Sequence, residues 1–210
     1  MRSVSTWFYI TAALLLFAVL TIAGCSVNAT PAPSPVVKVM TEGGHGTGVS
    51  IGNGIILTAE HVVGDNKTVK IKTEAGTVID ADVLWSSEKY DIAYVRAKDA
   101  ADIGTANLAC REPRLGEEIT IRGNPSNQEF ITVWGRVAGP SREVFRWADV
   151  TVANMAIIPG QSGGPVFDKD GNVVGIVVGV MGSQVGFGVS LVGVGYFVAG
   201  DVVCGLLGRA

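Results

Sequence analysis

The heptapeptide Pro159-Gly160-Gln161-Ser162-Gly163-Gly164-Pro165 decides how the rest of the chain is interpreted. It places one serine between glycines, with a proline at each edge. Glycine adopts backbone angles that other residues resist and lets another segment approach closely, so this stretch predicts a sharp turn that presents a hydroxyl group. Ser162 is therefore a candidate nucleophile, and an ordinary glycine-rich turn between strands is the alternative.

A serine hydroxyl at neutral pH is a poor nucleophile without a base, and the chain contains only two histidines that could be that base. His45 lies in the polar turn 43–46, where we expect a solvated side chain. His61 follows an apolar strand predicted at 54–58, at the point where a short helical turn is expected to begin. The end of such an element is the better place to hold an imidazole, although a structural role for His61 is the alternative.

The order of these residues along the chain distinguishes between catalytic scaffolds. The segment 160–164 matches the G-x-S-x-G turn of α/β-hydrolases, but that fold needs a histidine after the serine, and both histidines precede it. The subtilisin order needs an aspartate before the histidine, and the first aspartate is Asp65. Only the order histidine, aspartate, serine remains, which is that of the chymotrypsin fold.

Asp91 is the strongest of the seven aspartates between His61 and Ser162. It opens the predicted strand 91–97, where apolar neighbours would carry its carboxylate toward the interior. A partly buried carboxylate needs a hydrogen-bonding partner, and an imidazole N–H would serve. The alternative is an aspartate that caps a strand or a turn.

Three segments of the chain resemble the catalytic motifs of trypsin-like serine proteases. They are Gly46-Thr47-Gly48-Val49 with Ile55-Ile56-Leu57-Thr58-Ala59-Glu60-His61-Val62-Val63, then Tyr90-Asp91-Ile92-Ala93, and finally Gly160-Gln161-Ser162-Gly163-Gly164-Pro165-Val166. Leu115-Gly116-Glu117-Glu118 followed by Gly123-Asn124-Pro125 is most similar to the bacterial HtrA/Deg branch. The resemblance covers about residues 36–191.

This resemblance implies a role for each motif residue in a serine endopeptidase. Ser162 would attack the scissile carbonyl, His61 would accept its proton and return it to the leaving amine, and Asp91 would orient the imidazole. The main-chain N–H groups of Gly160 and Ser162 would form the oxyanion hole. A protease-like domain that binds peptides without turnover is the alternative function.

The resemblance also implies a substrate-binding region. The pocket floor would be Ala156, followed by Ile157, and the absence of a carboxylate there predicts cleavage after small or medium apolar residues. An extended peptide substrate would pair with the strand containing Val177, Val178 and Gly179, with Gly186 and Gly188 near the pocket wall. Trypsin has a serine hydroxyl near its catalytic aspartate on this strand, and no hydroxyl is present here, so Asp91 needs other partners.

The pattern of short Val/Ile/Thr runs and glycine-rich turns predicts an all-β fold. Two halves, 36–110 and 111–210, each contain about six predicted strands, which the resemblance turns into two six-stranded antiparallel β-barrels. Gly52-Asn53 predicts a hairpin turn, and 68–73 shows the alternation of a half-buried strand. We expect the polar break 111–113 to join the halves and a short amphipathic helix to form within 195–208. We expect no PDZ domain after the second half.

The first 35 residues are expected to lie outside this domain. Residues 1–24 have the form of a secretory signal, and Ile22-Ala23-Gly24-Cys25 resembles a lipobox, in which Cys25 would be lipidated. Residues 25–35 would then form a proline-rich linker. An uncleaved transmembrane anchor is the alternative, and both place the domain in the cell envelope, outside the cytoplasm and tethered to the membrane.

The composition of the chain argues against nucleic-acid binding and metal binding. The net charge is −3 and the 16 Lys and Arg residues are dispersed, which argues against a nucleic-acid surface. Two histidines without an HExxH motif or a cysteine cluster predict no metal site, and no cofactor is expected. The expected partners are therefore a polypeptide substrate and the membrane. In an oxidising envelope Cys110 and Cys204 could form a disulfide, or they could remain two separate buried thiols.

Overall fold

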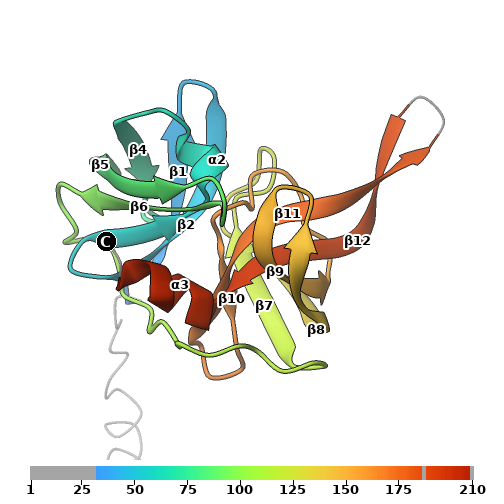
Figure 1. Ribbon diagram of the computed structural model, residues 1–210. Coiled ribbons are helices and arrows are strands. Elements are labelled where there is room, and N and C mark those ends of the chain that lie inside the picture. Colours follow the sequence, from blue (N-terminus) through green and yellow to red (C-terminus); the bar gives the residue numbers. More distant parts are fainter. Residues whose placement is uncertain (1–31, 186–187, 209–210) are drawn as a thin grey trace, which may run out of the picture. The chain divides into compact units, whose positions relative to one another are not determined.

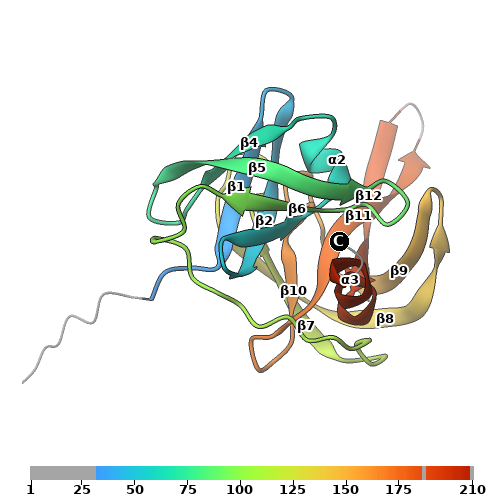
Figure 2. The same cartoon turned by 60° about the vertical axis from the view of Figure 1, so that its left-hand side comes forward.

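The computed structural model describes residues 32–185 and 188–208, and these form two closed antiparallel barrels that lie beside each other (Figures 1 and 2). Residues 1–31, which include the predicted signal segment and Cys25, lie outside the described part of the chain. The all-β fold with two six-stranded barrels is confirmed.

The first barrel has the strand order β1-β2-β3-β6-β5-β4 and closes by pairing of β1 with β4. Its strands are β1 (Val36–Thr41), β2 (Gly44–Gly52), β3 (Ile55–Thr58), β4 (Thr68–Lys72), β5 (Val78–Ser87) and β6 (Ile92–Ala97). The short helix α2 (Glu60–Val63) follows β3, as predicted around His61. Asn53, with φ of 53°, forms the predicted hairpin turn between β2 and β3.

The second barrel has the order β10-β11-β12-β9-β8-β7 and closes by pairing of β10 with β7. Its strands are β7 (Glu118–Gly123), β8 (Ile131–Val144), β9 (Trp147–Asn154), β10 (Pro165–Phe167), β11 (Val173–Val185) and β12 (Gly188–Ala199), and helix α3 (Gly200–Leu207) follows. Figure 1 shows the hairpin of β11 and β12 extending away from the barrels, in orange-red at the upper right.

One apolar cluster spans both barrels, in addition to a separate cluster within each barrel. Val49, Leu57 and Ile92 from the first barrel belong to the same cluster of buried side chains as Val150 and Ile176 from the second. Helix α3 adds the buried side chains of Val203 and Leu206 to this cluster. Because burial of apolar surface is the main favourable contribution to folding, this shared core holds the barrels in a fixed relation and so fixes any site at their boundary.

A disulfide joins Cys110 to Cys204, so the prediction of a bonded pair holds and that of two separate thiols does not. It attaches α3 to the segment that connects the barrels. The connecting segment already contacts the second barrel at residues 108 and 109, which precede the predicted join at 111–113. Leu108 forms a β-bridge with Val173, and the N–H of Ala109 donates to the Val173 carbonyl.

The short helix expected within 195–208 forms, but it begins only at Gly200. Residues 195–199 end β12, which lies between β9 and β11 and pairs with both. Tyr196, Phe197 and Val198 are all buried in this position. A short apolar run fits either a buried strand or a buried helix, and pairing on both edges decided for the strand. In the described part of the chain, no helix is long and apolar enough to cross a membrane.

Candidate active site

His61 and Asp91 are paired at the boundary of the two barrels. The imidazole Nδ1 of His61 lies 2.7 Å from Oδ2 of Asp91, and the main-chain N–H of His61 donates to Oδ1 at 2.9 Å. Because a carboxylate only accepts, Nδ1 carries the proton and Nε2 is left as the acceptor. The Asp91 side chain is 1% exposed and that of His61 is 34% exposed. The carboxylate is thus buried and the imidazole reaches the surface.

Asp91 is held by a turn and not by a strand. Its φ is 54°, its N–H donates to the Glu88 carbonyl, and β6 begins only at Ile92. The sequence-based prediction that Asp91 opens the strand is therefore wrong by one residue. An aspartate tolerates this left-handed conformation better than most residues do. The turn directs the carboxylate at α2, where His61 lies.

Trp147, at the start of β9, supplies the further partner that Asp91 was expected to need. Its indole N–H donates to Oδ2 of Asp91 at 3.1 Å. The ring packs against Gly179 of β11, where a Cβ atom would collide with it, and it lies 5.9 Å from the Tyr196 ring between centroids. One sequence signal pointed to such a partner, namely the absence of a hydroxyl group on the strand 177–179.

Ser162 lies in the loop before β10 and lines the same hollow as His61. This hollow has a volume of about 400 Å³ and is also lined by His45, Pro159 and Gly160. The structure therefore brings together the predicted base and the predicted nucleophile. Among the described residues, no hydrogen bond links the Ser162 hydroxyl to His61. Such bonds are often long in the absence of substrate.

The main-chain N–H groups of the serine loop divide into two sets. Those of Gln161, Gly163 and Gly164 donate to the carbonyls of Ile158, Val177 and Gln161, respectively. Those of Gly160 and Ser162 donate to no acceptor in the part of the chain that the structure describes. Gly160 has φ of 101°, and a Cβ there would collide with the Asn124 carbonyl, so only glycine fits.

Two residues near Ser162 were not predicted to contribute to the site. The hydroxyl of Thr47, on β2, donates to the Gly160 carbonyl at 2.7 Å and accepts from the Asn124 N–H at 3.0 Å. His45 was expected in a solvated turn, but it lies on β2, with Nε2 3.0 Å from the Asn124 carbonyl oxygen. Sequence spacing carries no signal for these contacts, because 79 residues separate His45 from Asn124.

Acidic side chains surround the histidine helix. Burial raises the pKa of Glu60, and the negative charges of Asp91 and Glu88 raise it further.

The residues that the structure describes contain no group of three or more His, Cys, Asp or Glu side chains that could hold a metal ion. The hollow presents the hydroxyl of Ser162 and the imidazole of His61, and the buried carboxylate of Asp91 contacts that imidazole.

The predicted substrate-binding residues are only partly brought together. Val177 and Val178 are buried on β11 beside the serine loop, and Ile157 is buried with its side chain against Gly195 of β12. Ala156, the predicted pocket floor, is exposed. Gly188 lies at the far end of the β11–β12 hairpin, paired with Val185 and remote in register from Val177, and Gly186 lies outside the described residues.

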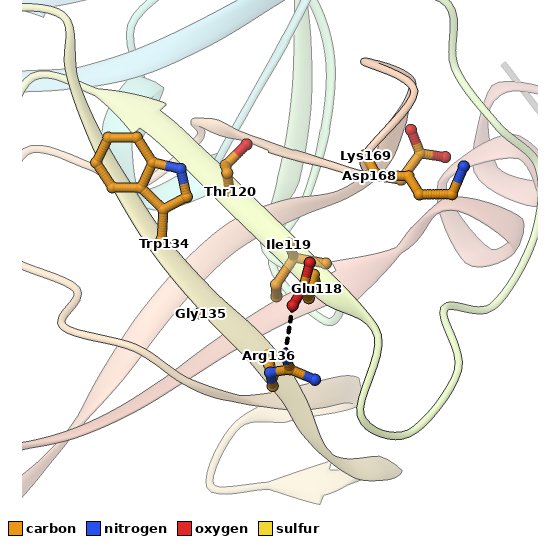
Figure 3. A pocket seen from close by; sticks show the side chains of 8 residues that line it. All are labelled: Glu118, Ile119, Thr120, Trp134, Gly135, Arg136, Asp168 and Lys169. Carbon is orange, nitrogen blue, oxygen red and sulfur yellow. Dashed lines mark hydrogen bonds and ion pairs between the residues drawn. The ribbon is translucent and has the colours of Figure 1, made fainter.

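A second hollow, of about 410 Å³, lies on the second barrel and is lined by residues of the paired strands β7 and β8 and by Asp168 and Lys169, which follow β10 (Figure 3). Figure 3 shows Glu118 and Arg136 joined by an ion pair, with Trp134 beyond them. The Trp134 residue is 73% exposed. The lining of this hollow contains neither a histidine nor a residue of the serine loop.

Comparisons with known proteins agree with this geometry. The chain is 32% identical over 127 residues to a probable periplasmic serine endoprotease DegP-like of Hahella chejuensis, covering 59% of this chain and 27% of that protein. It is 31% identical over 150 residues to the serine protease Do-like HtrA of Bacillus subtilis, covering 65% and 33%. The chain thus spans about a quarter to a third of the length of these relatives.

The fold is also that of a solved protease structure. The serine endoprotease from Yersinia pestis superposes with a TM-score of 0.71 at 22% identity, covering 85% of this chain and 62% of that one. The family model for the trypsin-like peptidase domain matches residues 46–176, which is more than half of the chain. The chain therefore belongs to the trypsin-like peptidase family.

Proposed function

We propose that the chain is a serine endopeptidase that hydrolyses peptide bonds through Ser162, His61 and Asp91. The observation that carries this proposal is the 2.7 Å contact between the His61 imidazole and the buried Asp91 carboxylate, at a hollow that His61 shares with Ser162. The family and the protease names of the relatives support it.

In this mechanism the protonated Nδ1 of His61 leaves Nε2 free to accept the Ser162 proton as the hydroxyl attacks the substrate carbonyl. Asp91 stabilises the imidazolium that forms. The N–H groups of Gly160 and Ser162, which have no acceptor among the described residues, would bind the developing oxyanion. His61 then returns the proton to the leaving amine as the peptide bond breaks, which leaves the acyl group on Ser162. Water takes the place of the amine, gives its proton to His61 and attacks the acyl carbonyl, and His61 passes that proton to the Ser162 oxygen as the ester bond breaks.

The proposed substrate is a polypeptide cleaved after small or medium apolar residues. Residues 155–158 are Met-Ala-Ile-Ile and carry no carboxylate that could pair with a Lys or Arg side chain. Of these residues, Ala156 is exposed, whereas Ile157 is buried against Gly195 in the core of the second barrel. We assign main-chain pairing with the substrate to the strand 177–179.

A fluorophosphonate probe, which reacts only with an activated serine, tests the proposal. We expect labelling of the wild type and none of Ser162→Ala or His61→Ala. Both variants should unfold at the same urea concentration as the wild type, which separates loss of chemistry from loss of fold. Absence of labelling in a folded wild type, with and without an unfolded protein substrate, would overturn the proposal.

A second candidate function is a latent or silent peptide-binding module. One observation favours it: no hydrogen bond joins the Ser162 hydroxyl to His61 in the described part of the chain. In that case Ser162→Ala would bind the same peptides as the wild type, and neither protein would cleave them. Cleavage by the wild type alone decides for the enzyme.

We further propose that Cys25 is lipidated and tethers the domain to the outer side of a membrane. The lipobox-like segment 22–25 supports this, as does the periplasmic location in the name of one relative. Metabolic labelling with a palmitate analogue should mark the wild type and not Cys25→Ser. Membrane-bound protein without label would instead indicate an uncleaved anchor.

A further inference from the structure

We infer that Trp147 is a positioning residue that acts through Asp91, and this inference rests on the proposed function. Its indole N–H donates to Oδ2 of Asp91 at 3.1 Å, and the same oxygen accepts from the His61 ring at 2.7 Å. The other carboxylate oxygen accepts from the His61 main chain. The three donors together define the plane and position of the Asp91 carboxylate.

The need for such a donor follows from the burial of Asp91. A buried carboxylate has lost its water and must receive hydrogen bonds to remain charged. Trypsin-like proteases can supply one from a serine on the strand that matches 177–179, where this chain has Val177, Val178 and Gly179. An indole N–H can only donate, so unlike a hydroxyl group it cannot accept the hydrogen bond of the His61 ring in place of the carboxylate.

The packing around Trp147 fixes the direction of its N–H group. The ring occupies the space that a side chain at Gly179 would need, and it packs with Tyr196 in the shared core. The next residue, Ala148, donates its N–H to the Lys89 carbonyl at 3.0 Å, in the turn that precedes Asp91. The start of β9 is therefore attached to the Asp91 turn by both main chain and side chain.

This arrangement makes the catalytic pair depend on both barrels. Asp91 and His61 come from the first barrel, whereas Trp147 comes from the second. Loss of the indole donor should leave the carboxylate less well oriented toward Nδ1 of His61, and the imidazolium that forms during acylation less well stabilised. The expected consequence is a lower kcat with little change in KM, because the contact contributes to the reacting groups and not to substrate binding.

Two variants of Trp147 separate the N–H group from the bulk of the ring. Trp147→Phe removes the donor and part of the ring, and replacement by benzothienylalanine removes the donor at nearly constant shape. Trp134→Phe, at the exposed tryptophan near the second hollow, is the matched control. We expect both Trp147 variants to lose about 10- to 100-fold in kcat and in the rate of fluorophosphonate labelling, and Trp134→Phe to lose neither.

A second measurement does not depend on turnover. The chain has two histidines, so ¹⁵N-histidine labelling gives the resonances of only His45 and His61. The Nδ1 resonance of His61 should move in both Trp147 variants and stay in place in Trp134→Phe. Wild-type kcat in the folded benzothienylalanine variant, or an unmoved His61 resonance, overturns the inference. A wild type that fails to react with fluorophosphonate overturns the proposed function instead, and the resonance still decides whether Trp147 positions the pair.

Discussion

The main-chain N–H of Thr47 donates to the carbonyl oxygen of Ser162 at 2.8 Å. Thr47 belongs to β2 of the first barrel, and Ser162 belongs to the loop that enters β10 of the second. The Thr47 side chain is fully buried and binds the same loop again at the Gly160 carbonyl. The serine loop is therefore held by the barrel that also carries His61.

Replacing Thr47 by valine should lower both stability and turnover. Valine has nearly the same shape but leaves the Gly160 carbonyl and the Asn124 N–H without their partner, at a cost of about 1–3 kcal/mol in the free energy of unfolding. The Gly160–Gln161 peptide also loses its anchor, so kcat should fall toward the roughly 10²- to 10³-fold loss seen when an oxyanion donor is removed.

Urea unfolding and peptide-ester hydrolysis measure these two effects. Thr47→Ser keeps the hydroxyl and should retain most of the activity. If Thr47→Val were as stable and as active as the wild type, the hydroxyl would have no role in holding the serine loop.

A charge contact between the barrels predicts loss of stability in acid. Glu129, in the loop between β7 and β8, binds Lys72 at 2.8 Å and Lys38 at 3.0 Å. Its hydrogen bonds with Lys72 and Lys38 hold the pKa of Glu129 below the ordinary value of 4.5. Because the pKa of Glu129 is lower in the folded state than its ordinary value of 4.5, its ion pairs contribute fully to the stability of the folded state above pH 4.5. This contribution is lost as the pH falls below 4.5 and through the lowered pKa of the folded state.

We therefore expect Glu129→Gln to be less stable than the wild type at pH 7 and to lose less stability between about pH 5 and pH 3. Thermal unfolding temperatures measured across this pH range show how steeply the stability of each protein depends on pH. Glu143→Gln, at an exposed residue of β8 that makes no ion pair within the described residues, is the control. Equal slopes for Glu129→Gln and the wild type would contradict the prediction.

The residues proposed to be catalytic stood out in the sequence because they lie in short local motifs. His61 and Ser162 are identified by the residues next to them and by their order, and a buried Asp91 follows from its apolar neighbours. Trp147 could not be found in this way, since it is separated from Asp91 by 56 residues and nothing local to position 147 indicates its partner. The missing hydroxyl at 177–179 showed that a partner was needed but not where it would come from.

Alternation of apolar and polar residues identified a half-buried strand such as β4. The type of element was predicted wrongly where this alternation is absent. At β4 only Val69 and Ile71 are buried, as the alternation predicts. At 195–199 every residue is buried, because β12 has a strand on each side, so no alternation remains to exclude a helix. The position of Gly188 depended on the length of the β11–β12 hairpin, which is set by pairing and not by composition.

Cleavage is expected after small or medium apolar residues. Residues 155–158 carry no carboxylate, so a Lys or Arg side chain bound at this segment would lose its water without gaining an ion-pair partner, whereas an alanine or valine side chain has no charge to desolvate. Mass spectrometry of the peptides released from an unfolded protein would give the preference directly, with Ser162→Ala as the control for contaminating proteases. A strong preference for Lys or Arg would contradict the apolar pocket.

The disulfide between Cys110 and Cys204 should contribute more to stability than to chemistry. It closes a sequence separation of 94 residues, for which the chain-entropy relation gives about 4–5 kcal/mol. It attaches α3 to the connecting segment, and Val203 and Leu206 of α3 then cover the shared core. We expect Cys110→Ser with Cys204→Ser to unfold at much lower urea concentration, while the fluorophosphonate labelling rate of the folded fraction stays near that of the wild type. Reduction of the wild type should reproduce the shift and leave the double variant unchanged. A labelling rate that falls in step with stability would show that the disulfide also holds the site.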